Sequence, residues 1–215
     1  LTPYFGVSLF IWASILSITL TFLAVGYYGG SVLSTLLDRS QLEFAYFAAP
    51  VASAVAILLA AIAYPVLFPL LAGTNLVLSS FFGSLVLLAF PLVALSAMNP
   101  LLVALQRNED DRGDGGAGRV FFVSTIGSVA GVLMTAFVFI PLMRNYTGIL
   151  LLSVALCGLV LIYVAAARVV TKRQRLTLAV GAGFTALLAG GLAIGQQRYL
   201  DAVSGDPGFA FEIKA

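Results

Sequence analysis

The sequence has few of the residues on which soluble enzymes depend. It contains no histidine and a single cysteine, Cys157, and only 9% of its 215 residues are charged. The missing histidines exclude histidine metal sites and histidine general bases, and the lone cysteine has no disulfide partner within the chain. Cys157 lies in an apolar run, which predicts a small buried packing residue. A soluble domain carries about 25% charged residues, so this chain must place much of its surface in lipid.

Apolar sequence dominates the chain, at 61% hydrophobic residues. Runs of about 20 apolar residues between polar turns predict an all-α, polytopic transmembrane helical bundle. We expect residues 1–200 to form this bundle in six spans, with a seventh span upstream. Residues 201–215 form a polar tail, which we expect to begin a linker or a soluble domain. The six expected spans are Phe5–Tyr28, Phe44–Ala72, Leu76–Leu105, Val120–Met143, Thr147–Ala167 and Leu176–Gly195.

Several prolines lie inside these expected spans. Proline removes a backbone N–H and crowds the carbonyl four residues earlier, so it kinks or ends a helix. We therefore expect Pro65 and Pro69 to kink the second span or to end it early, and Pro91 to kink the third span.

The stretch Gly118–Met143, GRVFFVSTIGSVAGVLMTAFVFIPLM, carries the most specific packing pattern. Its small residues recur at spacings of three and four, so they share one helix face. A GxxxG pair on that face lets another helix approach closely. The stretch from Val120 onward contains no charge, and the pattern predicts a transmembrane helix packed tightly inside a bundle. The residues predicted to pack helices together are Ser124, Gly127, Ser128 and Gly131 here, and Gly191 and Gly195 in the last span.

Lysine and arginine are distributed unevenly over the expected loops. Eight of the 11 follow the first, third and fifth spans, one follows the fourth span and two follow the sixth. Cytoplasmic loops carry the excess of these residues in membrane proteins. We therefore expect the loops that contain Arg39, Arg107–Arg119 and Lys172–Arg175 to be cytoplasmic. Because these basic residues sit in loops and form no patch, nucleic acid is not an expected partner.

Four blocks of the sequence share a pattern with a known protein family. The blocks are TPYFGVSLFIWASI at Thr2–Ile15, GYYGGSVLSTLLDR at Gly26–Arg39, SAMNP at Ser96–Pro100 and AGRVFFVSTIGSVAGVLMTAFVFIP at Ala117–Pro141. They resemble the membrane region of the fused major-facilitator-like/spermidine synthase family, whose members are prokaryotic, membrane-bound relatives of polyamine aminopropyltransferases. The resemblance covers most of the chain from Thr2 to Pro141, and it is most specific in the last block.

This resemblance implies a multi-pass protein of the prokaryotic cytoplasmic (inner) membrane, with one more helix before the first block. It also implies a Rossmann-like domain that binds decarboxylated S-adenosylmethionine and a polyamine, beginning near Phe211. Such a domain needs a glycine-rich strand-to-helix turn and acidic residues that hold amines. The chain is expected to form no strand, so we predict no catalytic and no cofactor-binding residue within it. Whether an attached domain is an aminopropyltransferase stays open.

Gly29, Gly30, Asp38 and Arg39 resemble the loop motif between helices two and three of major-facilitator proteins. In that motif the glycines permit a tight turn, and the charged pair contacts a neighbouring helix end and biases the conformation. The alternative is a solvated loop with an incidental ion pair, worth about 0–1 kcal/mol.

Acidic residues gather in the long polar loop, at Glu109, Asp110, Asp111 and Asp114. They could hold a divalent cation, but their spacing lacks the register of a calcium loop. A solvated acidic loop is the better interpretation, so no metal site is predicted.

The sequence leaves three functions open. The leading hypothesis is a membrane-anchoring and scaffolding domain of a spermidine-synthase-like protein, without catalysis in this chain. The second is a non-enzymatic accessory subunit of a larger membrane complex. The third is a small-solute transporter, which is disfavoured because ion-coupled carriers place charges inside the membrane and no expected span contains one. The expected partners are the lipid bilayer and either other membrane subunits or a further domain of the same protein.

Overall fold

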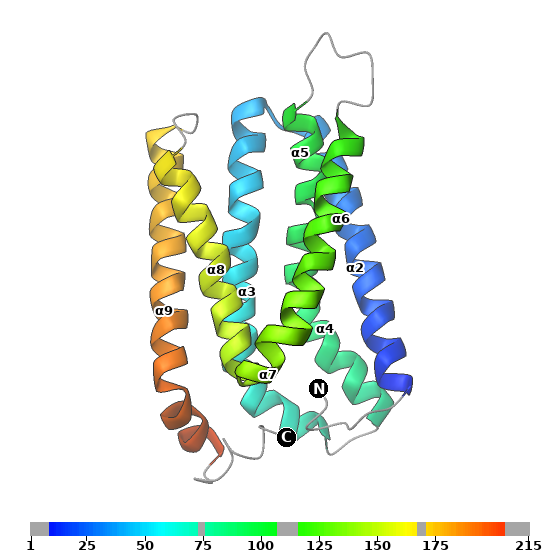
Figure 1. Ribbon diagram of the computed structural model, residues 1–215, viewed down its shortest axis with the longest axis vertical. Coiled ribbons are helices and arrows are strands. Elements are labelled where there is room, and N and C mark those ends of the chain that lie inside the picture. Colours follow the sequence, from blue (N-terminus) through cyan, green and yellow to red (C-terminus); the bar gives the residue numbers. More distant parts are fainter. Residues whose placement is uncertain (1–8, 73–75, 107–115, 167–170, 205–215) are drawn as a thin grey trace.

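Every regular element among the described residues, 9–72, 76–106, 116–166 and 171–204, is helical in this computed structural model (Figure 1). The predicted all-α class is therefore confirmed. The elements in chain order are α2 (Leu9–Leu36), α3 (Arg39–Ala72), α4 (Leu76–Ser96), α5 (Met98–Gln106), α6 (Ala117–Met134), the π-helical turn η1 (Thr135–Phe139), α7 (Ile140–Leu142), α8 (Asn145–Ala166) and α9 (Lys172–Ser204).

Six helical segments are long and apolar enough to cross a membrane, which confirms the number of spans expected in the chain. α4 and α5 together form one of them, and α6, η1 and α7 form another. The expected seventh helix, upstream, lies outside the described residues. The six segments are Trp12–Leu36, Arg39–Leu67, Phe81–Gln106, Ala117–Leu142, Tyr146–Ala165 and Lys172–Leu200.

Two expected loops are helical in the structure. α2 continues to Leu36, so most of the loop expected at residues 29–43 belongs to α2 or α3. α9 begins at Lys172, so the basic loop expected at Lys172–Arg175 is its first turn. α9 also continues to Ser204, which makes the first residues of the expected tail helical, while residues 205–215 lie outside the described part of the chain.

Side-chain capping explains where α3 and α9 begin. The Gln41 side-chain oxygen accepts a hydrogen bond from the backbone N–H of Asp38 at 3.2 Å. The Gln174 side chain accepts bonds from the backbone N–H of Thr171 at 3.3 Å and from its hydroxyl at 2.7 Å. Both are the glutamine half of a capping box, in which the third helical residue satisfies a donor before the first turn. Each box starts a helix inside a polar sequence.

The third span changes direction near its end. α4 ends at Ser96 and α5 starts at Met98, because Pro100 has no N–H to donate to the carbonyl of Ser96. Pro91 lies inside α4, and the α4 ribbon bends along its length in Figure 1.

α3 runs through Pro65 and Pro69 to Ala72, so these prolines do not end the helix. The other expected outcome, a kink, is seen in Figure 1, where the last turns of α3 bend away from the rest of the helix. The missing N–H of Pro65 frees the carbonyl of Ala61, four residues earlier. The Tyr146 hydroxyl donates a hydrogen bond to this carbonyl at 3.1 Å, and the Tyr199 hydroxyl donates to the carbonyl of Ile62 at 2.6 Å. Neighbouring helices therefore satisfy the backbone that the proline disturbs, which is how membrane helices tolerate proline.

Tyr146→Phe is expected to lower the stability of the solubilised chain by about 1 kcal/mol, because it leaves a buried carbonyl without a donor. For a chain of this size this corresponds to a fall of about 2–4 °C in the thermal unfolding midpoint. Tyr28→Phe is the control, since the Tyr28 side chain is 75% exposed. Equal shifts in both variants would contradict a role for this hydrogen bond.

The buried core lies where α3 meets α8 and α9. One cluster includes Leu58, Tyr146 and Ala189, and a second includes Ala54 and Cys157. The burial expected for Cys157 is confirmed. In Figure 1, α3 stands between the α8–α9 pair and the group formed by α2, α4 and α5.

The basic helix starts share one end of the bundle. Figure 1 shows the starts of α3, α6 and α9 at its upper end, and the described residues there include Arg39, Arg119 and Lys172. The fold therefore brings together, at one end of the bundle, the basic segments that we expected on one side of the membrane. That this side is cytoplasmic stays a prediction.

Candidate functional site

α6 is a spanning helix that stands apart from the rest of the chain. In its most apolar 18-residue window, none of the residues is buried. Val120, in the first turn, is 6% exposed and is the buried residue of α6. The other spans bury between 17% and 39% of the corresponding window. A membrane helix that is exposed along most of its length has most of its side surface available to lipid or to another protein.

The small-residue face of α6 touches the chain only near its beginning. Val120, Ser124, Gly127 and Gly131 follow one another at spacings of three and four, so they share a face. Val120 is buried and Ser124 is partly buried, and α6 contacts α5. A Cβ placed on Gly127 or on Gly131 would meet no atom within 4 Å. The expectation that this helix packs tightly inside the bundle is therefore wrong for the described chain, because the spacing indicates which face can be approached and does not supply a partner.

Two of the three hydroxyl groups on α6 are satisfied within the helix itself. Ser128 donates to the carbonyl of Ser124 at 2.9 Å, and Thr125 donates to the carbonyl of Phe121 at 2.8 Å. Such back-bonding to the preceding turn is common for serine and threonine in helices. It lets these two side chains lie in an apolar environment with their donors satisfied.

The end of α6 widens into the π-helical turn η1 before Pro141. The backbone N–H of Ile140 donates to the carbonyl of Thr135, five residues earlier, and Pro141 follows without an N–H. π-helical turns of this kind are frequent at functional positions. This one gives α6 an irregular end at Thr135–Phe139, in a segment without buried residues.

Gly191 and Gly195 in α9 are open in the same way. A Cβ on either residue would meet no atom within 4 Å. Ile194, between them, is 91% exposed. This pair therefore packs against no helix among the described residues, and its packing role stays a prediction.

Among the described glycines, the closest approach to a neighbouring helix occurs at a pair that was not among the predicted packing residues. A Cβ on Gly26 would lie 2.5 Å from the carbonyl oxygen of Val93, and a Cβ on Gly30 would lie 2.5 Å from that of Ala97. Real side chains do not approach backbone this closely, so only glycine fits at both positions. The signal was present, since Gly26 and Gly30 have the GxxxG spacing that was recognised at Gly127 and Gly131.

The four residues of the expected loop motif are not all in a loop. Gly29 and Gly30 lie inside α2, Asp38 precedes α3, and Arg39 is its first residue. A Cβ on Gly29 would meet no atom within 4 Å, in contrast to Gly30. Arg39 donates a hydrogen bond from its guanidinium to the carbonyl of Leu105 at 3.3 Å, which lies in the last turn of α5. This is the kind of contact with a neighbouring helix end that the motif implies, and its conformational role stays a prediction.

The part of the chain that the structure describes holds no group of three or more metal-ligating His, Cys, Asp or Glu side chains. The acidic residues at 109–114 lie outside the described residues.

Comparisons with protein-family models, with curated proteins and with solved structures find no match for this chain. The resemblance to the fused major-facilitator-like/spermidine synthase family therefore rests on the four sequence blocks alone. Two of these blocks meet in the fold, because Gly26 and Gly30 of the second pack against Val93–Pro100, which includes the third.

Proposed function

We propose that this chain is a non-catalytic membrane scaffold whose α6 receives a transmembrane helix of a partner subunit. The observation that carries the proposal is the exposure of α6 along its most apolar window, together with the open space beside Gly127 and Gly131. A helix that only anchored the chain would gain stability by packing against its own bundle. Most of α6 does not pack in this way, since its residues are exposed.

A second glycine pair in the same chain shows how a face of small residues packs against other helices. Gly26 and Gly30 in α2 receive α4 and α5 so closely that a Cβ at either position would overlap backbone atoms. Gly127 and Gly131 repeat the same spacing on a helix without a neighbour at those positions. Helix association in membranes depends on close packing at small residues, since lipid tails are as apolar as leucine. We therefore expect the occupant to be a helix that presents an equally close, largely apolar face.

The family resemblance extends this proposal to an enzyme-linked scaffold. On that hypothesis the bundle anchors a soluble aminopropyltransferase-like domain at the inner membrane of a prokaryote. The catalytic groups would then belong to that domain and not to the helices described here. An aminopropyl-transfer assay on the natural full-length protein tests this extension independently of the docking of α6.

The composition of the native particle tests the scaffold proposal. We expect particles extracted from their own membranes with a lipid-retaining polymer to contain this chain and a second membrane polypeptide in a fixed ratio. Native mass spectrometry measures that ratio. Particles that contain this polypeptide and lipid alone, at every chain concentration tested, would overturn the proposal.

A further inference from the structure

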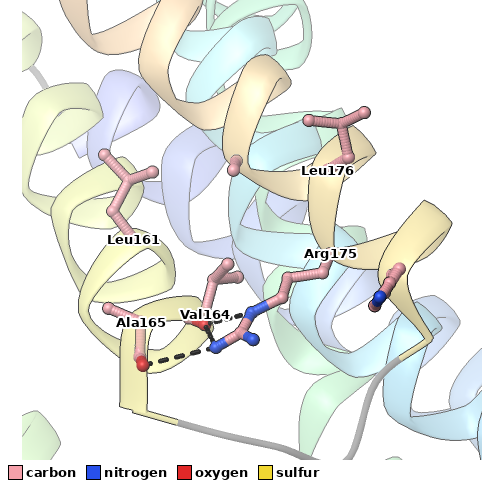
Figure 2. Close-up of a pocket in the computed structure, with 7 residues that line it drawn as sticks. Leu161, Val164, Ala165, Arg175 and Leu176 are labelled. Carbon is pink, nitrogen blue, oxygen red and sulfur yellow. Dashed lines mark hydrogen bonds between the residues drawn. The ribbon is translucent and has the colours of Figure 1, made fainter.

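A groove opens between the end of α8 and the beginning of α9, with a volume of about 450 Å³ (Figure 2). This volume is in the range of small-molecule sites, about 300–1,000 Å³. The lining residues come from both helices. They are Leu161, Val164 and Ala165 of α8, and Lys172, Arg175, Leu176 and Ala179 of α9.

Two cationic residues at the start of α9 belong to the lining of the groove, and the rest of the lining is apolar. Lys172 lies at the first residue of α9, and Arg175 follows one turn later. Leu176 and Ala179 lie further along α9, away from the end of the bundle, and Leu161 lies opposite on α8. None of the seven lining residues is acidic. A phospholipid has a similar arrangement, because its charged phosphate lies at the membrane surface and its apolar acyl chains lie deeper.

Arg175 is held in place by the end of α8. Its Nε–H donates to the carbonyl of Val164 at 2.7 Å, and one terminal nitrogen donates to the carbonyls of Val164 and Ala165, the latter at 3.3 Å. The last four carbonyls of a helix have no partner within it, so the guanidinium satisfies two of them. Figure 2 shows the second terminal nitrogen of Arg175 without a bond to the residues drawn. The side chain thus keeps donors for a ligand while its position is fixed.

We infer that this groove binds the headgroup phosphate of an anionic phospholipid. Lys172 and Arg175 hold the phosphate, and one acyl chain lies along Leu161, Leu176 and Ala179. Basic pockets between membrane helices bind anionic headgroups in this way. The charge of the groove selects an anionic lipid over a zwitterionic one, and its apolar half selects a lipid over a free anion.

Native mass spectrometry of the full chain in detergent tests this inference, with dioleoyl phosphatidylglycerol as the probe and dioleoyl phosphatidylcholine as its zwitterionic counterpart. Lys172→Gln is expected to weaken phosphatidylglycerol binding about fivefold, the effect of one cation near the membrane surface. Lys172 is exposed, so the variant keeps the fold. Arg173→Gln is the matched control, because it removes the same charge from the same helical turn but does not line the groove.

A second variant tests the apolar half. Ala179→Phe fills the groove without changing its charge, and we expect it to weaken phosphatidylglycerol binding while phosphatidylcholine binding stays low throughout. Inorganic phosphate is expected not to displace the bound lipid at equal concentration. Equal losses in Lys172→Gln and Arg173→Gln would show a diffuse attraction and overturn the site. Displacement by inorganic phosphate, or unchanged binding in Ala179→Phe, would overturn the assignment of a lipid.

Discussion

Gly30→Leu is expected to lower the thermal unfolding midpoint of the solubilised chain by about 2–12 °C. A Cβ at this position would lie 2.5 Å from the carbonyl oxygen of Ala97 and 2.9 Å from its Cα, and both are backbone atoms that cannot rotate away. Leucine would force α2 away from α4 and α5. Overpacking of this kind costs about 1–3 kcal/mol or more, and each kcal/mol shifts the midpoint of a chain of this size by about 2–4 °C.

Gly29→Leu provides the matched control for this prediction. The substitution is the same and its position is adjacent in the same helix, but a Cβ there meets no atom within 4 Å. Leucine also has a higher helix propensity than glycine, which lies about 0.8–1.0 kcal/mol below alanine. The midpoint of Gly29→Leu, measured as loss of the monodisperse chromatographic peak after heating, should therefore equal or exceed that of the wild type. A comparable fall in both variants would contradict the α2 contact described above.

The double variant Gly127→Leu/Gly131→Leu is expected to lose its partner while the isolated chain keeps its stability. Both residues are exposed and a Cβ at either position meets no atom within 4 Å, so leucine has room there, and its helix propensity favours α6. The same side chains would hold a partner helix away from the face. A loss of about 1.4 kcal/mol or more of association energy lowers the partner's occupancy at least about tenfold.

Val129→Phe is the control for this double variant. Val129 is exposed on α6 but lies two residues from Gly127, and therefore on another side of the helix. The partner should be retained in Val129→Phe, as measured by its ratio to this chain in particles extracted from the membrane. Retention of the partner in the double variant would count against the docking face. A fall in the thermal midpoint of the isolated double variant would show that the face packs within the chain.

The opposite outcomes expected for Gly30 and Gly127 show what the sequence can and cannot specify. Both glycines have a partner glycine at a spacing of four, and that spacing determines which residues share a helix face. Whether another helix lies against the face depends on how the spans are arranged. Gly26 and Gly30 receive α4 and α5, and Gly127 and Gly131 receive nothing from the described chain. The sequence pattern is the same in the two cases, and only the fold distinguishes them.

The number of spans was predictable because the length of an apolar run is a direct consequence of the thickness of the bilayer. The ends of α2, α3 and α9 were not predictable from hydrophobicity, because these helices continue into polar sequence. Capping residues decide the starts of α3 and α9, and both glutamines, Gln41 and Gln174, stand three residues after the cap. This spacing was readable from the sequence.

Contacts between distant residues were beyond sequence reasoning. Pro65 indicates that the carbonyl of Ala61 needs a donor, but not that Tyr146, 85 residues along the chain from Ala61, provides it. The hydrogen bond from Arg39 to Leu105 was equally unpredictable, since it joins helix ends that are 66 residues apart. Such pairs follow from the packing of α3 against its neighbours, which no local pattern encodes.

Photo-crosslinking from α6 in native membranes tests the central claim most directly. A small diazirine amino acid is placed at Ser128, on the small-residue face, or at Leu133, five residues later and about 140° around the helix. We predict a protein adduct of one defined mass from position 128 and mainly lipid adducts from position 133. Lipid adducts alone from both positions, or the same protein adducts from both, would contradict a partner helix seated on this face.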